Sequence, residues 1–202
     1  MMTTDAGGLF ASLPANDETA SARLHARLAD AAAREGILDV AYRTLDTPVG
    51  SLLLAATDRG LVRVVYPGQG HDTALAQLAD RVSPRILNAP GRLDPVARQM
   101  EEYFTGSRTE FDVPVDLRLA QGFRRRVLDH LPFIPYGSTE SYRQVASAAG
   151  SPRAVRAAGT ACATNPVPIV VPCHRVIRSD GTHGLYAGGQ AAKLALLALE
   201  AS

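Results

Sequence analysis

A cysteine and a histidine stand side by side late in the chain, in the segment Pro172-Cys173-His174-Arg175. Sulfur attacks as the thiolate, so a reactive cysteine needs a base, a cation or a helix dipole beside it. His174 could supply the base and Arg175 the cation. The apolar run 169–171 before them predicts a buried strand that ends in a nucleophile. The same pattern also fits an inert core cysteine, because free cysteines are usually buried.

The strand prediction limits how the two side chains can cooperate. Successive residues of a strand point to opposite faces. We therefore expect His174 to act on Cys173 through a water molecule or a bend in the chain.

Composition and targeting signals set the class of protein. The chain has 202 residues, of which 46% are hydrophobic and 20% charged, as in ordinary globular proteins of one or two small domains. No apolar run approaches the roughly 20 residues that cross a bilayer, and the first residues do not resemble a signal peptide. We therefore expect a cytoplasmic protein without a membrane partner.

The two cysteines also limit the chemistry. They lie eleven positions apart, at 162 and 173, and do not make a disulfide framework. The histidines show no metal-ligand spacing, so we expect no metal site and no cofactor.

The charge is distributed unevenly, although the net charge is only +1. Residues 118–202 carry ten basic and four acidic side chains, a net charge of +6, whereas residues 1–117 carry a net charge of −5. A basic C-terminal half is expected if only that half faces phosphate. The alternative is a charged surface that is simply solvated.

Hydrophobic patterns predict two domains of an α+β protein. An N-terminal extension, residues 1–36, combines a tail with an alanine-rich amphipathic helix at 19–35. A small α/β domain, residues 37–111, has antiparallel strands at 39–45, 51–56 and 61–66 and helices at about 72–81 and 94–105. The proline-bearing connector 112–116 marks the boundary.

The C-terminal domain, residues 117–202, is predicted to be mostly helical. A helix covers about 119–131, and two short helices follow at 141–149 and 152–163, joined by Gly150-Ser151-Pro152. Two helices with a tight glycine-containing turn have helix-turn-helix spacing. The domain is therefore expected to be winged-helix-like.

The segment 165–177 resembles the active-site segment of the O6-alkylguanine-DNA alkyltransferases, also called methylated-DNA–protein-cysteine methyltransferases. The similarity is strong over 118–200, weaker over 38–110, and includes Ser141-Tyr142-Arg143-Gln144 and Ala154-Val155-Arg156-Ala157. It implies direct-reversal repair by a monomer, on double-stranded DNA that contains O6-alkylguanine, with O4-alkylthymine as a further candidate substrate. The lesion would be flipped out of the duplex and its alkyl group transferred irreversibly to Cys173, in a single turnover.

The resemblance also assigns catalytic roles. His174 would take the thiol proton through a water molecule, and Glu200 would hold the imidazole. Asn165 would orient the backbone around the active site. Tyr142 would crowd the 3′ phosphate and donate a hydrogen bond to the departing guanine, together with the backbone N–H of Ala187.

DNA contacts are implied for the second helix of the pair. Arg156 would enter the base stack in place of the flipped nucleotide, and Arg153 and Ala157 would also contact DNA. The same similarity predicts a base pocket lined by Cys162, Pro168, Val176, Tyr186, Ala187, Gly188 and Lys193.

The sequence does not decide the role of every residue near the predicted pocket. For Lys193, an electrostatic role and simple surface solvation are both compatible with the sequence. Leu185, Ala187 and Cys162 depart from the common family pattern, which leaves the pocket size and the substrate range undecided.

Three other functions remain compatible with parts of this pattern. A non-catalytic sensor of alkyl damage would bind and flip the lesion without chemistry, although such proteins lack the cysteine that stands here as Cys173. A cysteine hydrolase would use Cys173 and His174 but would not need Arg156 or Tyr142. In a plain helix-turn-helix regulator, Cys173 would be a structural residue.

Overall fold

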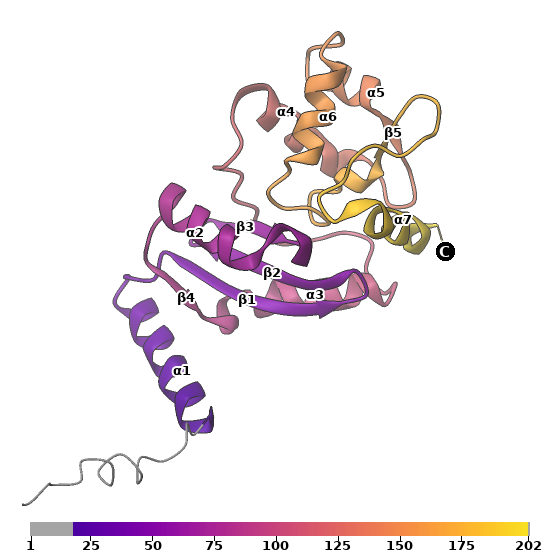
Figure 1. The fold of residues 1–202 in the computed structure, drawn as a ribbon. Helices are drawn as coiled ribbons and strands as arrows, with labels where there is room; N and C mark the ends of the chain where they lie inside the picture. The colour runs from indigo at the N-terminus through magenta and orange to yellow at the C-terminus, as the bar shows by residue number, and fades with distance from the viewer. Residues whose placement is uncertain (1–17, 202) are drawn as a thin grey trace, which may run out of the picture.

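In a computed structural model of the protein, residues 18–201 are described. Figure 1 shows the four-stranded sheet in the lower part of the molecule, with helix α1 projecting below it and a mostly helical part above it. The α+β class predicted from the sequence is confirmed. No helix in the described range is long and apolar enough to cross a membrane.

The sheet is mixed rather than purely antiparallel. Strands β1 (Val40–Thr47), β2 (Gly50–Thr57) and β3 (Gly60–Val65) form the expected antiparallel meander. The short strand β4 (Ile86–Asn88) pairs in parallel with β1, which gives the order β3-β2-β1-β4. The chain reaches β4 through helix α2 (His71–Arg81), and such a crossover allows parallel pairing. The sequence pattern missed β4 because three residues show no periodicity.

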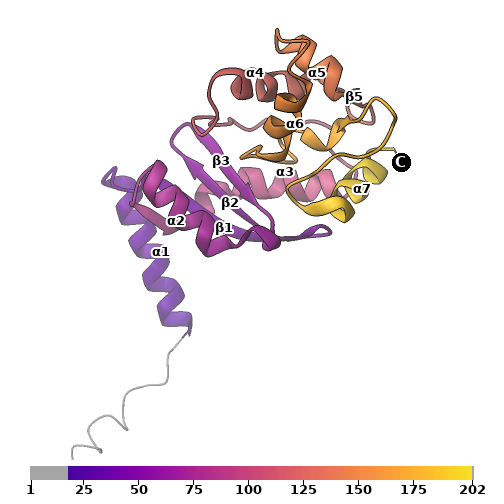
Figure 2. The same cartoon turned by 45° about the horizontal axis from the view of Figure 1, so that its top comes forward.

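The central strand β2 explains how the sheet is buried. Its odd-numbered side chains Leu53 and Ala55 pack with Leu78 of α2, whereas the even-numbered Leu52 and Leu54 pack with Met100. Met100 belongs to α3 (Asp94–Phe104), so the two helices cover opposite faces, as Figure 2 shows. A strand that is buried on both faces reads as a continuous apolar run, as β2 does.

Helix α1 (Glu18–Arg34) projects from the sheet beside β4 (Figure 1). Ala29 and Ala32 pack against Leu38, while Leu24 and Leu28 remain 63% and 52% exposed.

The helical part contains α4 (Gly122–His130), α5 (Tyr142–Ala148), α6 (Val155–Ala163) and α7 (Gly189–Glu200). Its core is continuous with the α3 face of the sheet. Helices α5 and α6 are the predicted helix-turn-helix pair, but α6 begins three residues later than expected. The N–H of Ala154 donates to the carbonyl of Ser151 at 2.9 Å, so residues 151–154 form a turn and the helix begins after it. Helix α4 also begins three residues late, at Gly122.

The predicted strand at 169–171 is wrong. These residues form a tight turn that is closed by an isolated bridge between Pro168 and Val171. Ile169 has φ of 75°, a left-handed conformation that is rare for a β-branched residue. Prolines at 166, 168 and 172 remove three backbone donors, so the segment cannot join a sheet ladder. Cys173–Arg175 then form one 3-10 turn, η5, before the short strand β6 (Val176–Ile177).

The edge strand β3 joins the sheet to the rest of the molecule. Its Leu61 exchanges backbone hydrogen bonds with Pro114 and Asp116 of the connector, each of 2.8 Å. Val64 donates to the carbonyl of Pro166, also at 2.8 Å, beside the active-site turn. A Cβ on Gly60 would collide with Pro114, so the connector lies directly against the strand. The free edge is thus covered, and the sheet is tied to the segment that carries Cys173.

Candidate active site

Cys173 lies at the start of η5 and is 1% exposed. The amide of Asn165 fixes the turn around it. Asn165 Nδ2 lies 3.2 Å from Cys173 Sγ and 2.8 Å from the carbonyl oxygen of Val171, and Oδ1 accepts from the N–H of Val167 at 3.0 Å. One buried side chain thus holds both ends of the turn and contacts the sulfur.

His174 and Glu200 form a buried pair behind the cysteine. His174 Nε2 lies 2.8 Å from Glu200 Oε1, and both residues are 4% exposed or less. The pKa of Glu200 is held at about 2, so the carboxylate is ionised at neutral pH and can only accept. Nε2 therefore carries the proton, and the other ring nitrogen, Nδ1, keeps its lone pair. Nδ1 is buried and has no hydrogen-bond partner among the described residues.

Glu200 stands at the end of α7 and collects five donors on its two oxygens. Besides His174, these are Tyr103 Oη at 2.7 Å, Arg175 Nε at 2.8 Å and Nη2 at 2.9 Å, and the N–H of Gly137 at 3.3 Å. Burial alone would raise the pKa of this carboxyl group, but the hydrogen bonds from His174, Arg175 and Tyr103 lower it to about 2. Glu200 is therefore a buried and fixed part of the site, although it lies near the end of the chain.

Arg175 is not the cation that activates the thiol. Its guanidinium is buried against Glu200, and Nη1 donates to the carbonyl of Ile134 at 2.7 Å. Sequence reasoning missed this role, and it missed Tyr103 entirely. Tyr103 belongs to α3, ninety-seven positions before Glu200, and no spacing signal connects the two.

Lys193 is the cation that faces the sulfur. It is fully buried in α7, and Nζ donates to the carbonyl oxygen of Val176 at 2.5 Å. Surface solvation, one of the two roles that the sequence allowed, is therefore wrong. Burial lowers the pKa of Lys193, and the lysine in turn lowers the pKa of Cys173.

The resting thiol is nevertheless protonated at neutral pH. Burial raises the pKa of Cys173 to about 11, against the opposing effects of Asn165 and Lys193. To react as a nucleophile, this thiol would therefore need a base. Burial lowers the pKa of His174 below its ordinary value of 6.5, so its imidazole is neutral at pH 7 and able to accept a proton.

Two of the predicted pocket residues interact with this centre, because the charge of Cys173 acts on Cys162 and the ring of Tyr186 lies beside that of His174. Cys162, Pro168, Val176 and Tyr186 are buried, and Ala187 and Gly188 are partly buried in the loop before α7. Burial raises the pKa of the Cys162 thiol far above its ordinary value, which leaves it a neutral wall residue. The ring of Tyr142, at the start of α5, contacts Gly159 and lies so close to Gly184 that no side chain would fit there.

A groove opens on the outer side of Tyr142. It has a volume of about 580 Å³, and Arg156 and Arg178 place positive charge along it. Cys173 does not line this groove, because the thiol is buried behind it. Arg153 and Ala157 are exposed beside Arg156 at the start of α6. Leu185 reaches the groove from the opposite loop and is 83% exposed.

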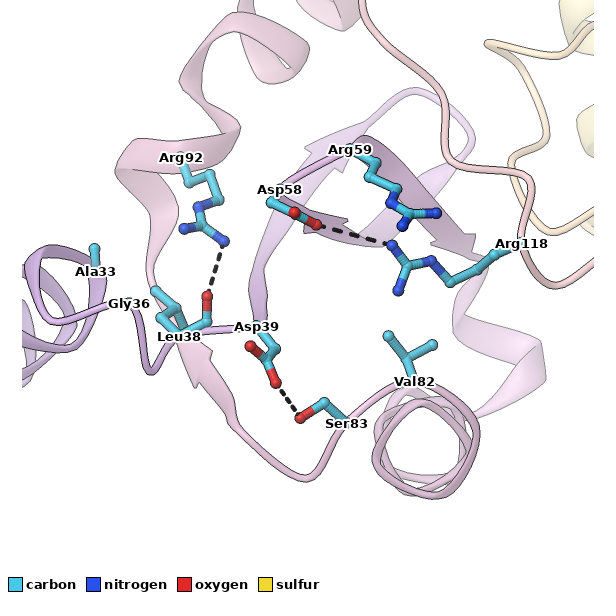
Figure 3. Close-up of a pocket in the computed structure, with 10 residues that line it drawn as sticks. All are labelled: Ala33, Gly36, Leu38, Asp39, Asp58, Arg59, Val82, Ser83, Arg92 and Arg118. Carbon is cyan, nitrogen blue, oxygen red and sulfur yellow. Dashed lines mark hydrogen bonds and ion pairs between the residues drawn. The ribbon is translucent and has the colours of Figure 1, made fainter.

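A second cavity, of about 480 Å³, lies far from this chemistry in the sheet domain (Figure 3). Arg59, Arg92 and Arg118 point into it together with Asp39 and Asp58. It contains neither a cysteine nor a histidine, and it does not include any residue of the cysteine centre.

No group of three or more His, Cys, Asp or Glu that could hold a metal ion occurs among residues 18–201.

Two family models match the chain. The ribonuclease-like domain of 6-O-methylguanine DNA methyltransferase matches residues 40–117, and the DNA-binding domain of the same family matches residues 122–202. The chain belongs to the 6-O-methylguanine DNA methyltransferase family. The sequence-based recognition of this family is confirmed, and so is the class of activity, a methyltransferase of DNA repair.

Individual relatives agree over most of the chain. The methylated-DNA–protein-cysteine methyltransferase of Mycolicibacterium paratuberculosis is 41% identical over 161 residues, which are 80% of this chain and 92% of the relative. The human protein of the same name is 38% identical and matches 78% of both chains. A crystal structure of Mycobacterium tuberculosis OGT in complex with DNA superposes with a TM-score of 0.70 and 40% identity, over 80% of this chain and 92% of that one.

Proposed function

We propose that this methyltransferase flips O6-alkylguanine out of duplex DNA and transfers the alkyl group to Cys173 in a single-turnover reaction. The observation that carries the proposal is the buried series Cys173, His174 and Glu200. It combines a protonated thiol with a neutral imidazole whose Nδ1 is free to accept a proton.

The transfer is a displacement at the alkyl carbon. His174 Nδ1 takes the thiol proton through a water molecule, and Sγ attacks the carbon bound to guanine O6. The S–C bond forms while the C–O6 bond breaks, and the electron pair stays on guanine. The imidazolium that forms is stabilised by Glu200, which is ionised and 2.8 Å away.

The departing guanine gains the proton that the thiol has lost. A donor near O6 or N3 stabilises the charge that develops there, as in an oxyanion hole. The hydroxyl of Tyr142 and the backbone N–H of Ala187 are the candidates. Burial raises the pKa of Tyr142 to about 12, so its hydroxyl remains a donor at physiological pH.

Reaching the thiol requires extrusion of the base, which costs a few kcal/mol of stacking and pairing. Arg156 is exposed on α6 at the rim of the groove and would fill the space that the nucleotide leaves. Proteins that bind the minor groove use such insertions to distort the duplex. A monomer suffices for this reaction, because every group in the proposal belongs to one chain.

Mass spectrometry of the protein after incubation with duplex DNA containing O6-methylguanine tests the proposal. We expect the peptide with Cys173 to gain one methylene's mass, up to one equivalent. Cys173→Ser should abolish the gain, and Cys162→Ser should retain it. Tight binding of the lesion without a mass change would overturn the transfer and identify a damage sensor.

A further inference from the structure

Tyr66 connects the sheet domain to the loop of the active site. It follows directly after β3 and is 2% exposed. Its hydroxyl lies 2.9 Å from the hydroxyl of Tyr186, 120 positions later in the chain. The two rings meet edge to face, with centroids 5.7 Å apart and an interplanar angle of 70°. A side chain of the N-terminal domain thus contacts a wall of the base pocket.

Tyr66 contacts the pocket loop at a second point. A Cβ added to Gly188 would lie 2.5 Å from Cε1 of Tyr66 and 2.6 Å from Cζ. The backbone of Gly188 therefore lies directly on the ring. Tyr66 holds the loop on both sides of Ala187, whose N–H is the proposed donor to guanine.

The backbone of Tyr66 is itself fixed. Its N–H donates to Oε1 of Gln69 at 3.0 Å, and the N–H of Gln69 donates back to the carbonyl of Tyr66 at 3.0 Å. The preceding residue, Val65, pairs with Leu53 in the sheet. The ring thus projects from a rigid element toward a loop that has few anchors of its own. Within that loop, the N–H of Gly189 donates to the carbonyl of Tyr186 at 3.0 Å, and the side chain of Leu185 is exposed.

The contact between Tyr66 and Tyr186 lies close to the proposed catalytic residue His174. Tyr186 is buried beside His174, with the ring centroids 6.4 Å apart and nearly perpendicular. Burial raises the pKa of both tyrosines, so both hydroxyls remain protonated and can hydrogen-bond at neutral pH. Movement of the loop would displace the Tyr186 ring and the N–H of Ala187 together.

We propose that Tyr66 is a positioning residue for alkyl transfer, through which the N-terminal domain holds the pocket loop of residues 186–188 against the base. The inference rests on the function proposed above. On this inference, the N-terminal domain affects the rate of alkyl transfer as well as the stability of the fold.

The variant Tyr66→Phe tests this role, because it keeps the ring and removes only the hydroxyl. We expect the transfer rate at saturating O6-methylguanine duplex to fall roughly tenfold, as a buried hydrogen bond to the reacting geometry is lost. The apparent affinity for unmodified duplex should change less than about twofold, since Tyr66 does not line the DNA groove. Tyr42→Phe is the matched control, because it makes the same change at a partly buried tyrosine of β1 packed in another cluster.

A double-mutant cycle separates the hydrogen bond from general destabilisation. If the two hydroxyls act as a pair, Tyr66→Phe with Tyr186→Phe should lose no more rate than the more damaging single variant. Multiplying losses would overturn the pairing. An unchanged rate in Tyr66→Phe, with only a lower unfolding temperature, would overturn the positioning role. Failure of the unsubstituted protein to modify Cys173 would instead overturn the proposed function, and this inference with it.

Discussion

The protonation states of three neighbouring side chains determine how the thiol can react. Cys173 has a pKa of about 11, Glu200 has a pKa of about 2, and the pKa of His174 lies below its ordinary value of 6.5. At pH 7 the thiol is neutral, the imidazole is neutral and the carboxylate is charged. In the proposed mechanism the proton therefore moves to His174 during the reaction, rather than leaving the thiol beforehand.

The pH dependence of the transfer rate tests this order of events. We expect the rate at saturating DNA to be flat between about pH 7 and 9 and to fall at acidic pH, as His174 becomes protonated below pH 6.5 and loses its lone pair. Rapid-quench measurement of Cys173 alkylation gives the profile. If the thiolate instead formed by loss of the proton to solvent, the rate would rise about tenfold per pH unit up to the pKa of the thiol, which would contradict the prediction.

At the residue scale, the sequence indicated those members of the site that are close together along the chain. Cys173 and His174 are adjacent, and Asn165 was recognised from the segment that surrounds them. Glu200 was predicted only because the surrounding sequence resembles a known family. Tyr103 gave no signal, because its contact with Glu200 depends on how α3 packs against α7. The burial of Lys193 was equally unpredictable, since a lysine is ordinarily exposed.

Among the elements, residues 169–171 were predicted to be a strand but form a turn, and this turn precedes Cys173. Its apolar residues resemble a strand, but three prolines leave too few donors for a ladder. The amide of Asn165 replaces the missing backbone hydrogen bonds. The nucleophile is therefore placed by one side chain and by an unusual backbone angle at Ile169.

Removal of that amide should disturb the turn and the sulfur together. Asn165→Ala loses three contacts and leaves the N–H of Val167 buried without this partner, whereas the carbonyl of Val171 still accepts from the N–H of Cys173 at 2.8 Å. We expect the free energy of unfolding to fall by about 1 to 3 kcal/mol, the cost of one buried group that loses its hydrogen bond. Urea unfolding measures this loss. Asn88→Ala, in the exposed part of β4, is the control and should change the free energy by less than about 1 kcal/mol.

Glu200, at the end of α7, should make the free energy of unfolding depend on pH in the acidic range. The pKa of Glu200 is lower in the folded protein than its ordinary 4.5, so this group stabilises the fold above pH 4.5 and the contribution is lost as the pH falls toward 2. Glu200→Gln should remove this pH dependence. It should also destabilise the protein at pH 7 by about 3 to 5 kcal/mol, because Arg175 remains buried without its counter-charge.

Urea unfolding between pH 7 and pH 3 measures both effects. Glu101→Gln is the matched control, because it removes an exposed carboxylate from α3. If Glu200→Gln and the unsubstituted protein lost stability in parallel down to pH 3, the folded pKa of Glu200 would not be depressed.

At the scale of the whole molecule, the net charges of the two parts of the chain agree with their roles in the proposed function. The groove that contains Arg156 lies in the part with a net charge of +6, while the acidic residues 1–117 contain the sheet. The sheet domain still reaches the chemistry, through Tyr103 at Glu200 and Tyr66 at Tyr186. In the proposed reaction both domains therefore contribute side chains to one centre, whereas the electrostatic contact with DNA is expected from the C-terminal domain alone.

Substitution of the exposed arginines should separate base extrusion from phosphate binding. Arg156→Ala is expected to slow transfer from duplex DNA by about 10- to 100-fold, because base extrusion costs a few kcal/mol and would lose its support. Reaction with the free base O6-benzylguanine, which needs no extrusion, should be unchanged. Arg153→Ala should leave the rate at saturation intact, weaken binding to all sequences, and reduce the slope of log affinity against log salt by about 1. Arg98→Ala, on the exposed surface of α3, should change none of these quantities. Equal losses on duplex and free base in Arg156→Ala would place Arg156 in the support of the pocket instead of in the opening of the duplex.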